Sequence, residues 1–173
     1  WSERTNGKFE NIDDEVSIYS FSKSKIPFYF INSHNDVQTL ALIKYLSVDV
    51  LFNAGTPRKL NKNILTSVRH GVINVHPGIL PKYRGCSAVE WAIYNNDYVG
   101  NTAHFMSEGY DEGPIIQIEK YDFISETDYT SIRNKVYEEG CSLAGKTLKK
   151  ISEDGITPTE GLIQDESKAK YWG

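Results

Sequence analysis

Three residues of the sequence have the types and spacing needed to transfer a proton and to hold an oxyanion: Asn74, His76 and Asp111. Asn74 and His76 are two positions apart in the run 72–76, so in a strand both side chains point to one face. Polar side chains on a buried strand face are costly unless they are hydrogen-bonded or take part in chemistry. An amide beside an imidazole can hold a developing oxyanion and transfer a proton, so this pair indicates a candidate active site.

Asp111 belongs to the glycine-rich loop 107–113, which follows a predicted strand at 102–106. The glycines of this loop let the backbone approach a ligand closely. If the strands 72–76 and 102–106 are neighbours, the carboxylate of Asp111 can reach His76 and orient its ring. The structural alternative is an Asx turn at Asp111, with Asn74 and His76 bonded to backbone groups in the core.

Other polar residues have plainer interpretations. His104 lies in the middle of a predicted strand, which favours a core histidine bonded to the backbone. Cys86 lacks the Cys-His-Asn context of a nucleophile. The cations Lys82 and Arg84 either hold an anionic substrate or fix their loop. The loop 55–60 either wraps a flat heterocycle with backbone groups or forms a turn before a helix.

The elements that must position these residues alternate along the chain. We expect strands at 27–31, 48–54, 72–76, 102–106 and 115–123, and helices at 37–47, 61–69, 88–94 and 128–151. This order predicts an α/β, Rossmann-like, mostly parallel sheet with helices on both faces and a ligand beyond the carboxyl ends of the strands. We expect one domain over 1–173, with an irregular segment at 1–25 and a tail at 152–173 that either docks on the sheet or is a free end.

Composition excludes several classes of protein. The 173 residues carry a net charge of −4, which argues against a nucleic-acid footprint. No apolar run is long enough for a membrane helix, and no signal-peptide pattern is present, so a cytoplasmic location is expected. The two cysteines are too far apart in sequence to indicate a disulfide framework or a metal site.

Two blocks of sequence resemble one known family. Residues 74–85 read N-V-H-P-G-I-L-P-K-Y-R-G, which resembles the N-x-H-P-x-x-L-P-x-[YFW]-[RK]-G signature of the 10-formyltetrahydrofolate-dependent formyltransferases. Residues 102–116 are similar to the companion block that ends in D-x-G-P-I-I, and the resemblance runs from about residue 26 to 151.

The resemblance implies a formyltransferase fold, 10-formyltetrahydrofolate as co-substrate, no metal, and a catalytic triad at Asn74, His76 and Asp111. It also implies folate contacts at Arg58, Leu60, Ser107, Glu108, Gly109 and Tyr110. Contacts with the acceptor substrate are expected at Pro77, Lys82 and Arg84.

The acceptor is inferred by elimination among family members. Only about 25 residues precede the resemblance, so the N-terminal strand region is expected to be missing or atypical, which weakens a glycinamide ribonucleotide formyltransferase. The acidic charge and the lack of a C-terminal barrel after Gly173 argue against the methionyl-tRNA enzyme. A nucleotide-linked amino sugar is the expected acceptor. The alternatives are glycinamide ribonucleotide, or a non-catalytic folate-binding module that forms a homodimer through exposed sheet edges.

Overall fold

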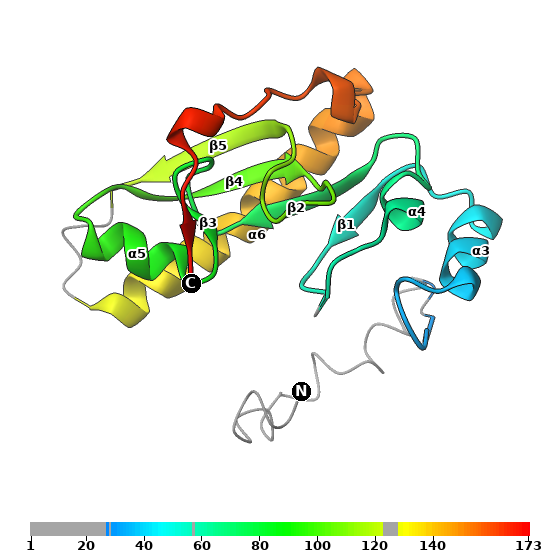
Figure 1. The fold of residues 1–173 in the computed structure, drawn as a ribbon, viewed down its shortest axis with the longest axis horizontal. Coiled ribbons are helices and arrows are strands. Elements are labelled where there is room, and N and C mark those ends of the chain that lie inside the picture. The colour runs from blue at the N-terminus through cyan, green and yellow to red at the C-terminus, as the bar shows by residue number, and fades with distance from the viewer. Residues whose placement is uncertain (1–26, 28, 57, 123–127) are drawn as a thin grey trace. The chain divides into compact units, whose positions relative to one another are not determined.

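The computed structural model describes residues 27, 29–56, 58–122 and 128–173. Residues 33–173 form one compact unit, to which the helices and strands below belong. The expected irregular segment 1–25 lies outside the described residues. The central sheet has four strands in the order β1 (Leu51–Asn53), β2 (Val72–His76), β4 (Val99–Phe105) and β5 (Ile115–Tyr121) (Figure 1).

The strand directions correct the predicted topology. A sheet flanked by helices is confirmed, but only β1 and β2 are parallel, whereas the β2–β4 and β4–β5 pairs are antiparallel. The prediction of a mostly parallel sheet is therefore wrong for the described strands. The segment 77–98 does not cross back to the start of β2. It ends beside the carboxyl end of β2, where Thr102 pairs with His76, so β4 must run in the opposite direction.

Three of the four described helices begin at a capping side chain. Asp36 accepts a hydrogen bond from the Thr39 amide at 2.7 Å, and Asp128 caps the longest helix in the same way. The described helices are α3 (Val37–Tyr45), α4 (Lys62–Leu65), α5 (Ala88–Tyr94) and α6 (Tyr129–Asp154). All four predicted helices are confirmed, although α4 is shorter than the expected range 61–69.

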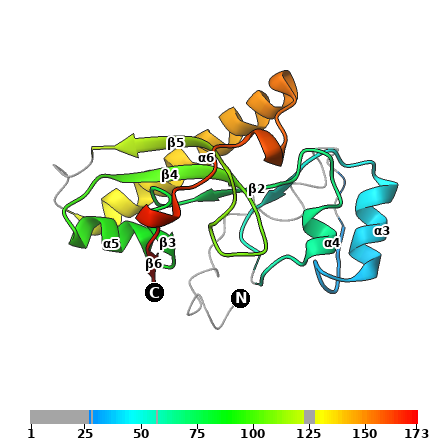
Figure 2. The ribbon, with the colours of Figure 1, turned by 45° about the horizontal axis from the view of Figure 1, so that its top comes forward.

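Helix α6 runs along β2, β4 and β5 and covers one face of the sheet (Figures 1 and 2). Its buried side chains include Val136, Leu143 and Ile151, and Ile151 packs with Ile73 of β2 and Phe105 of β4. Because side chains alternate along a strand, the neighbouring residues of β2 and β4 point to the opposite face. That second face carries the polar residues singled out by the sequence.

The predicted strand at 27–31 is not observed. None of its described residues is in a strand, and in the described sheet β1 is an edge strand that pairs only with β2. An apolar, β-forming run becomes a strand only where a neighbouring strand accepts its backbone hydrogen bonds, so composition alone was insufficient here.

The C-terminal tail is docked, which is one of the two arrangements expected from the sequence. After the turns η2 (Pro158–Glu160) and η3 (Glu166–Lys168), β6 (Tyr171–Trp172) pairs in parallel with β3 (Arg84–Gly85). The ring of Trp172 lies 4.6 Å from that of Trp91 and 5.8 Å from that of Tyr83. Gly85 has φ +91°, and a Cβ there would lie 2.3 Å from the Trp172 carbonyl oxygen, so this pairing requires glycine. Among the described helices, none is long and apolar enough to cross a bilayer.

Candidate functional site

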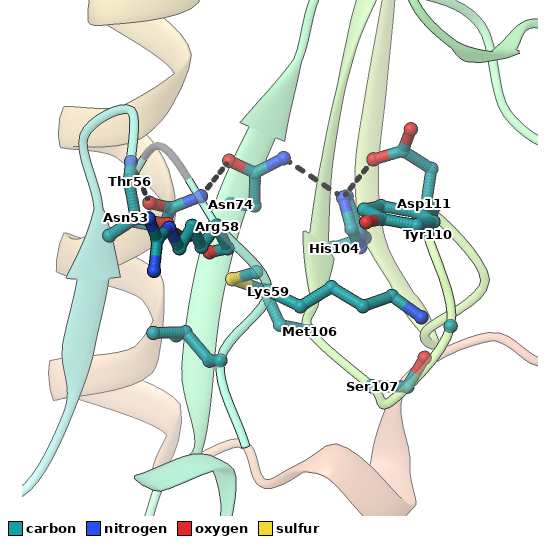
Figure 3. Close-up of a pocket in the computed structure, with 12 residues that line it drawn as sticks. Asn53, Thr56, Arg58, Lys59, Asn74, His104, Met106, Ser107, Tyr110 and Asp111 are labelled. Atoms are coloured by element: carbon teal, nitrogen blue, oxygen red, sulfur yellow. Dashed lines mark hydrogen bonds and ion pairs between the residues drawn. The ribbon is translucent and has the colours of Figure 1, made fainter. Parts of the chain in front are cut away.

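The register of β2 and β4 assembles the polar face of the sheet. Asn74 pairs directly with His104, and His76 pairs with Thr102. Residues opposite each other in an antiparallel pair project to the same face, so Asn74 and His104 stand side by side. The amide nitrogen Nδ2 of Asn74 lies 3.2 Å from Nε2 of His104 (Figure 3).

A cavity of about 180 Å³ opens over this pair. Its walls come from the ends of β1 and β4, the middle of β2 and the two loops that follow β1 and β4 (Figure 3). Asn74, His104 and Asp111 lie together on its lining. The cavity therefore exposes an amide, an imidazole and a carboxylate to one bound molecule.

Asp111 reaches this face because the loop after β4 folds back. Strand β4 ends at Phe105 opposite Ile73, at the start of β2, so the loop must return along the sheet to bring Asp111 to His76. Asp111 has φ +55°, a left-handed conformation that Asp tolerates better than most residues. Its Oδ2 accepts a hydrogen bond from the Gly85 amide at 2.9 Å.

The carboxylate of Asp111 lies between two histidines. Oδ2 is 3.6 Å from Nδ1 of His76, and Oδ1 is 3.6 Å from Nε2 of His104. The Asp111 side chain is 17% exposed, whereas both histidine side chains are at most 6% exposed. A carboxylate in this position accepts a proton or orients an imidazole with little competition from water.

His76 is packed beneath the cavity and does not line it. Its Nε2 lies 2.6 Å from the Tyr83 carbonyl oxygen, and a carbonyl only accepts, so Nε2 carries the hydrogen. The other ring nitrogen faces Asp111. Both ring nitrogens of His76 thus face protein groups, and its expected role as a donor to the substrate oxygen stays a prediction.

His104, and not His76, is the histidine that lines this cavity. Its Nδ1 lies 2.9 Å from the Phe105 carbonyl oxygen, as expected for a core histidine. Burial lowers the pKa of His104 from 6.5 to about 4, because the charged ring loses its hydration. The ring is therefore neutral at pH 7. Its place in the middle of a predicted strand favoured a core histidine, so the sequence did not indicate a role for His104 in the site.

Most residues expected to contact folate do line the cavity. Arg58 and Leu60 come from the loop after β1, and Ser107, Gly109 and Tyr110 from the loop after β4. Glu108 is exposed and lies outside the lining. Across the cavity, Nζ of Lys59 lies 4.2 Å from the centroid of the Tyr110 ring, so a cation–π contact joins the two loops.

The residues expected to bind the acceptor are dispersed. Pro77 lines a second, mainly apolar cavity of about 350 Å³ that shares Asn53 and Asn74 with the first. Lys82 lines neither cavity, and its ammonium donates to Asp97. Arg84 is fully buried and bonded to the tail, so its expected role in substrate binding is wrong and it has the alternative role of fixing the loop.

Two amide side chains near the site were not predicted from the sequence. Asn53, at the end of β1, donates from Nδ2 to Oδ1 of Asn74 at 3.1 Å. Gln164, in the tail, donates from Nε2 to the carbonyl oxygens of Asp111 and Gly113, both at 2.8 Å. Asn53 had the signal that identified Asn74, namely a polar residue at the carboxyl end of an apolar strand. Gln164 had no local signal.

Within the described residues, no group of three or more His, Cys, Asp or Glu is arranged to hold a metal.

Comparisons with known proteins identify the family of this chain. The family model for formyl transferases matches residues 5–148. The methionyl-tRNA formyltransferase of Clostridium tetani is 34% identical over 125 residues, which are 72% of this chain and 40% of that protein. The chain therefore spans less than half the length of this curated relative.

Solved structures with the same fold include formyltransferases of several kinds. A 4-N formyltransferase of Francisella tularensis is 26% identical, with TM-score 0.63 over 79% of this chain and 54% of that one. Phosphoribosylglycinamide formyltransferase of Anaplasma phagocytophilum is 23% identical, with TM-score 0.70 over 88% and 78%. The formyltransferase PseJ of Anoxybacillus kamchatkensis, solved with a UDP-linked formamido sugar and tetrahydrofolate, is 20% identical, with TM-score 0.63 over 72% and 64%. The chain belongs to the formyl transferase family.

Proposed function

We propose that this chain transfers the formyl group of 10-formyltetrahydrofolate to a primary amine. The observation that carries the proposal is the position of Asn74 and Asp111 on one cavity wall. Nδ2 of Asn74 uses one hydrogen toward His104, and the second is available to a formyl oxygen. Asp111 stands beside it with a carboxylate that can take the amine's proton.

The proposed reaction needs no covalent enzyme intermediate. The neutral amine attacks the formyl carbon, and negative charge develops on the formyl oxygen, where the Asn74 N–H donates a hydrogen bond. The amine then loses a proton to the Asp111 carboxylate, directly or through water. The bond from the formyl carbon to the folate nitrogen breaks, and that nitrogen receives the proton from Asp111.

His76 has a supporting role in this scheme. His76 donates from Nε2 to the Tyr83 carbonyl oxygen, which holds its ring with Nδ1 3.6 Å from Oδ2 of Asp111. This contact orients Asp111 without any direct contact between His76 and the substrate. The proposed triad is therefore Asn74 and Asp111 at the cavity, with His76 behind Asp111.

The cavity is suited to the co-substrate. Oγ of Ser107 is buried and has no hydrogen-bond partner among the described residues, so a polar heterocycle bound there would supply one. Tyr110 offers an aromatic face, and Leu60 an apolar surface. Arg58, Ser107, Gly109 and the backbone around them supply the remaining proposed folate contacts.

We propose a nucleotide-linked amino sugar as the acceptor. The net charge of −4 disfavours a polyanionic partner, and the 26% identical Francisella tularensis structure is named a 4-N formyltransferase. Methionyl-tRNA is the second candidate, favoured by the 34% identity with the Clostridium tetani enzyme.

The proposal is tested by incubating the full-length protein with 10-formyltetrahydrofolate and a panel of amines. The panel holds nucleotide-linked amino sugars, glycinamide ribonucleotide and methionyl-tRNA, and products are read by mass spectrometry. A formylated amino sugar is the expected product. If methionyl-tRNA were the one formylated product, the proposed acceptor would be wrong and the proposed formyl transfer would stand. Tetrahydrofolate binding without any formylated product would contradict catalysis and leave a folate-binding module.

A further inference from the structure

A chain of hydrogen bonds with fixed direction begins at Asn53. Its Oδ1 lies 2.9 Å from the amide nitrogen of Thr56 and 3.3 Å from that of Gly55. A backbone N–H can only donate, so the oxygen of the Asn53 amide must face these two groups. The NH₂ group of Asn53 is therefore directed away from the loop.

That NH₂ group fixes the orientation of the next amide. Nδ2 of Asn53 lies 3.1 Å from Oδ1 of Asn74. A nitrogen donor on this side requires the oxygen of Asn74 to face Asn53, which turns Nδ2 of Asn74 toward His104 and the cavity (Figure 3). With the opposite orientation, two NH₂ groups would face each other.

The far end of the chain leads independently to the same orientation. The Phe105 carbonyl oxygen can only accept, so Nδ1 of His104 carries the hydrogen in their 2.9 Å contact. In the neutral ring Nε2 then has a free lone pair, which accepts the hydrogen bond from Asn74 at 3.2 Å. The donors and acceptors along this chain are therefore determined by backbone groups at its two ends. These groups are the amides of Gly55 and Thr56 at one end and the carbonyl of Phe105 at the other.

We propose that Asn53 is a positioning residue that holds the Asn74 amide with its N–H, and not its carbonyl, toward the formyl oxygen. This inference rests on the proposed formyl transfer and adds the group that orients the donor. An acceptor in place of the Asn53 donor would repel the oxygen of Asn74 and attract its NH₂ group, so it would oppose the orientation that His104 favours and would turn an oxygen atom toward the developing oxyanion. The loss would fall on the transition state more than on co-substrate binding.

The substitution Asn53→Asp tests this inference directly. The carboxylate still accepts from the Gly55 and Thr56 amides, so the loop keeps its turn, but it cannot donate to Asn74. We expect kcat to fall by about 100-fold or more, the typical loss of one oxyanion donor, with tetrahydrofolate affinity within about threefold of wild type. Asn134→Asp is the control for the change from amide to carboxylate, because Asn134 is exposed on α6 and lines neither cavity. A kcat for Asn53→Asp within threefold of wild type would overturn the proposal.

A second measurement does not depend on activity or on the folding of a variant. Nitrogen-15 NMR of the imidazole of His104 in the wild-type protein at pH 7, assigned with His104→Gln, reports its tautomer. The proposal requires the hydrogen on Nδ1 and an unprotonated Nε2. A hydrogen on Nε2 would contradict the fixed direction of the hydrogen bonds whether or not the protein transfers formyl groups. The expected tautomer in a protein that formylates no amine would instead contradict the proposed function alone.

Discussion

Arg84 and Gln164 form a buried, two-pronged hydrogen bond between β3 and the C-terminal tail. Oε1 of Gln164 accepts from Nε of Arg84 at 3.1 Å and from Nη2 at 2.8 Å. Nε2 of the same Gln164 donates to the carbonyl oxygens of Asp111 and Gly113. Every donor and acceptor of this amide is thus used, and the tail is joined to the loop that carries Asp111.

The first prediction concerns this junction. Gln164→Leu leaves the Arg84 guanidinium and two loop carbonyls without these partners, and we expect the free energy of unfolding to fall by about 2–4 kcal/mol. Turnover should fall as well, because the Asp111 loop loses its support. Urea unfolding and kcat measure the two effects. Ile163→Ala is the control, since the adjacent Ile163 is 84% exposed and its truncation should change stability by less than about 0.5 kcal/mol. Equal stability of the two variants would contradict the role of Gln164.

Sequence periodicity predicted individual elements better than their directions. The ranges expected for a strand at 72–76 and a helix at 88–94 coincide with β2 and α5. Alternation of apolar residues is the same in parallel and antiparallel strands, so the direction of β4 could not be inferred from it. The register that places His104 opposite Asn74 could likewise not be inferred from periodicity.

The site could be predicted where its residues are local in sequence. Asn74 and His76 share one strand face, and Asp111 lies in a glycine-rich loop, so all three carried a recognisable pattern. Arg84 was misassigned because its partners in the tail lie 80 or more residues away. The local sequence around a buried cation with distant partners does not differ from that around a cation that binds a substrate.

The second prediction concerns the carboxylate. Asp111→Asn keeps the side-chain shape, and Asn tolerates the left-handed backbone at φ +55°, so the fold should be unchanged. The amide cannot take the amine's proton, and we expect kcat to fall by about 100-fold or more. Steady-state kinetics and thermal melting test this, with the exposed Asp122→Asn as the control for the lost charge. Near-normal turnover of Asp111→Asn would refute the proposed proton transfer.

The third prediction is a pH dependence of stability that comes from His104. Its pKa is about 4 in the folded protein and 6.5 as a model value, so between these pH values the unfolded chain binds a proton that the native ring does not. This contribution to the free energy of unfolding is complete above pH 6.5 and is lost as the pH falls toward 4. The loss amounts to about 3 kcal/mol.

Urea unfolding of wild type and His104→Gln at pH 7 and pH 4.5 isolates this contribution. The acidic groups common to both proteins largely cancel in the difference. We expect the wild type to lose more stability than the variant over this interval. Parallel losses in the two proteins would show that His104 does not resist protonation in the native state.

The last prediction uses the close backbone approach at Gly113. A Cβ at this position would lie 1.7 Å from the Phe105 carbonyl oxygen, so Gly113→Ala must displace the loop two residues after Asp111. We expect the free energy of unfolding to fall by about 2 kcal/mol because of the added clash. We expect kcat to fall by about 100-fold, because a shift of a catalytic group by about an ångström slows catalysis to this extent. Gly145→Ala is the matched control. It lies in α6 with nothing within 4 Å of its added Cβ, so alanine there should stabilise the protein by roughly 0.5–1 kcal/mol and leave kcat unchanged. If Gly113→Ala retained wild-type kcat despite the displaced loop, Asp111 could not be the group that takes the amine's proton.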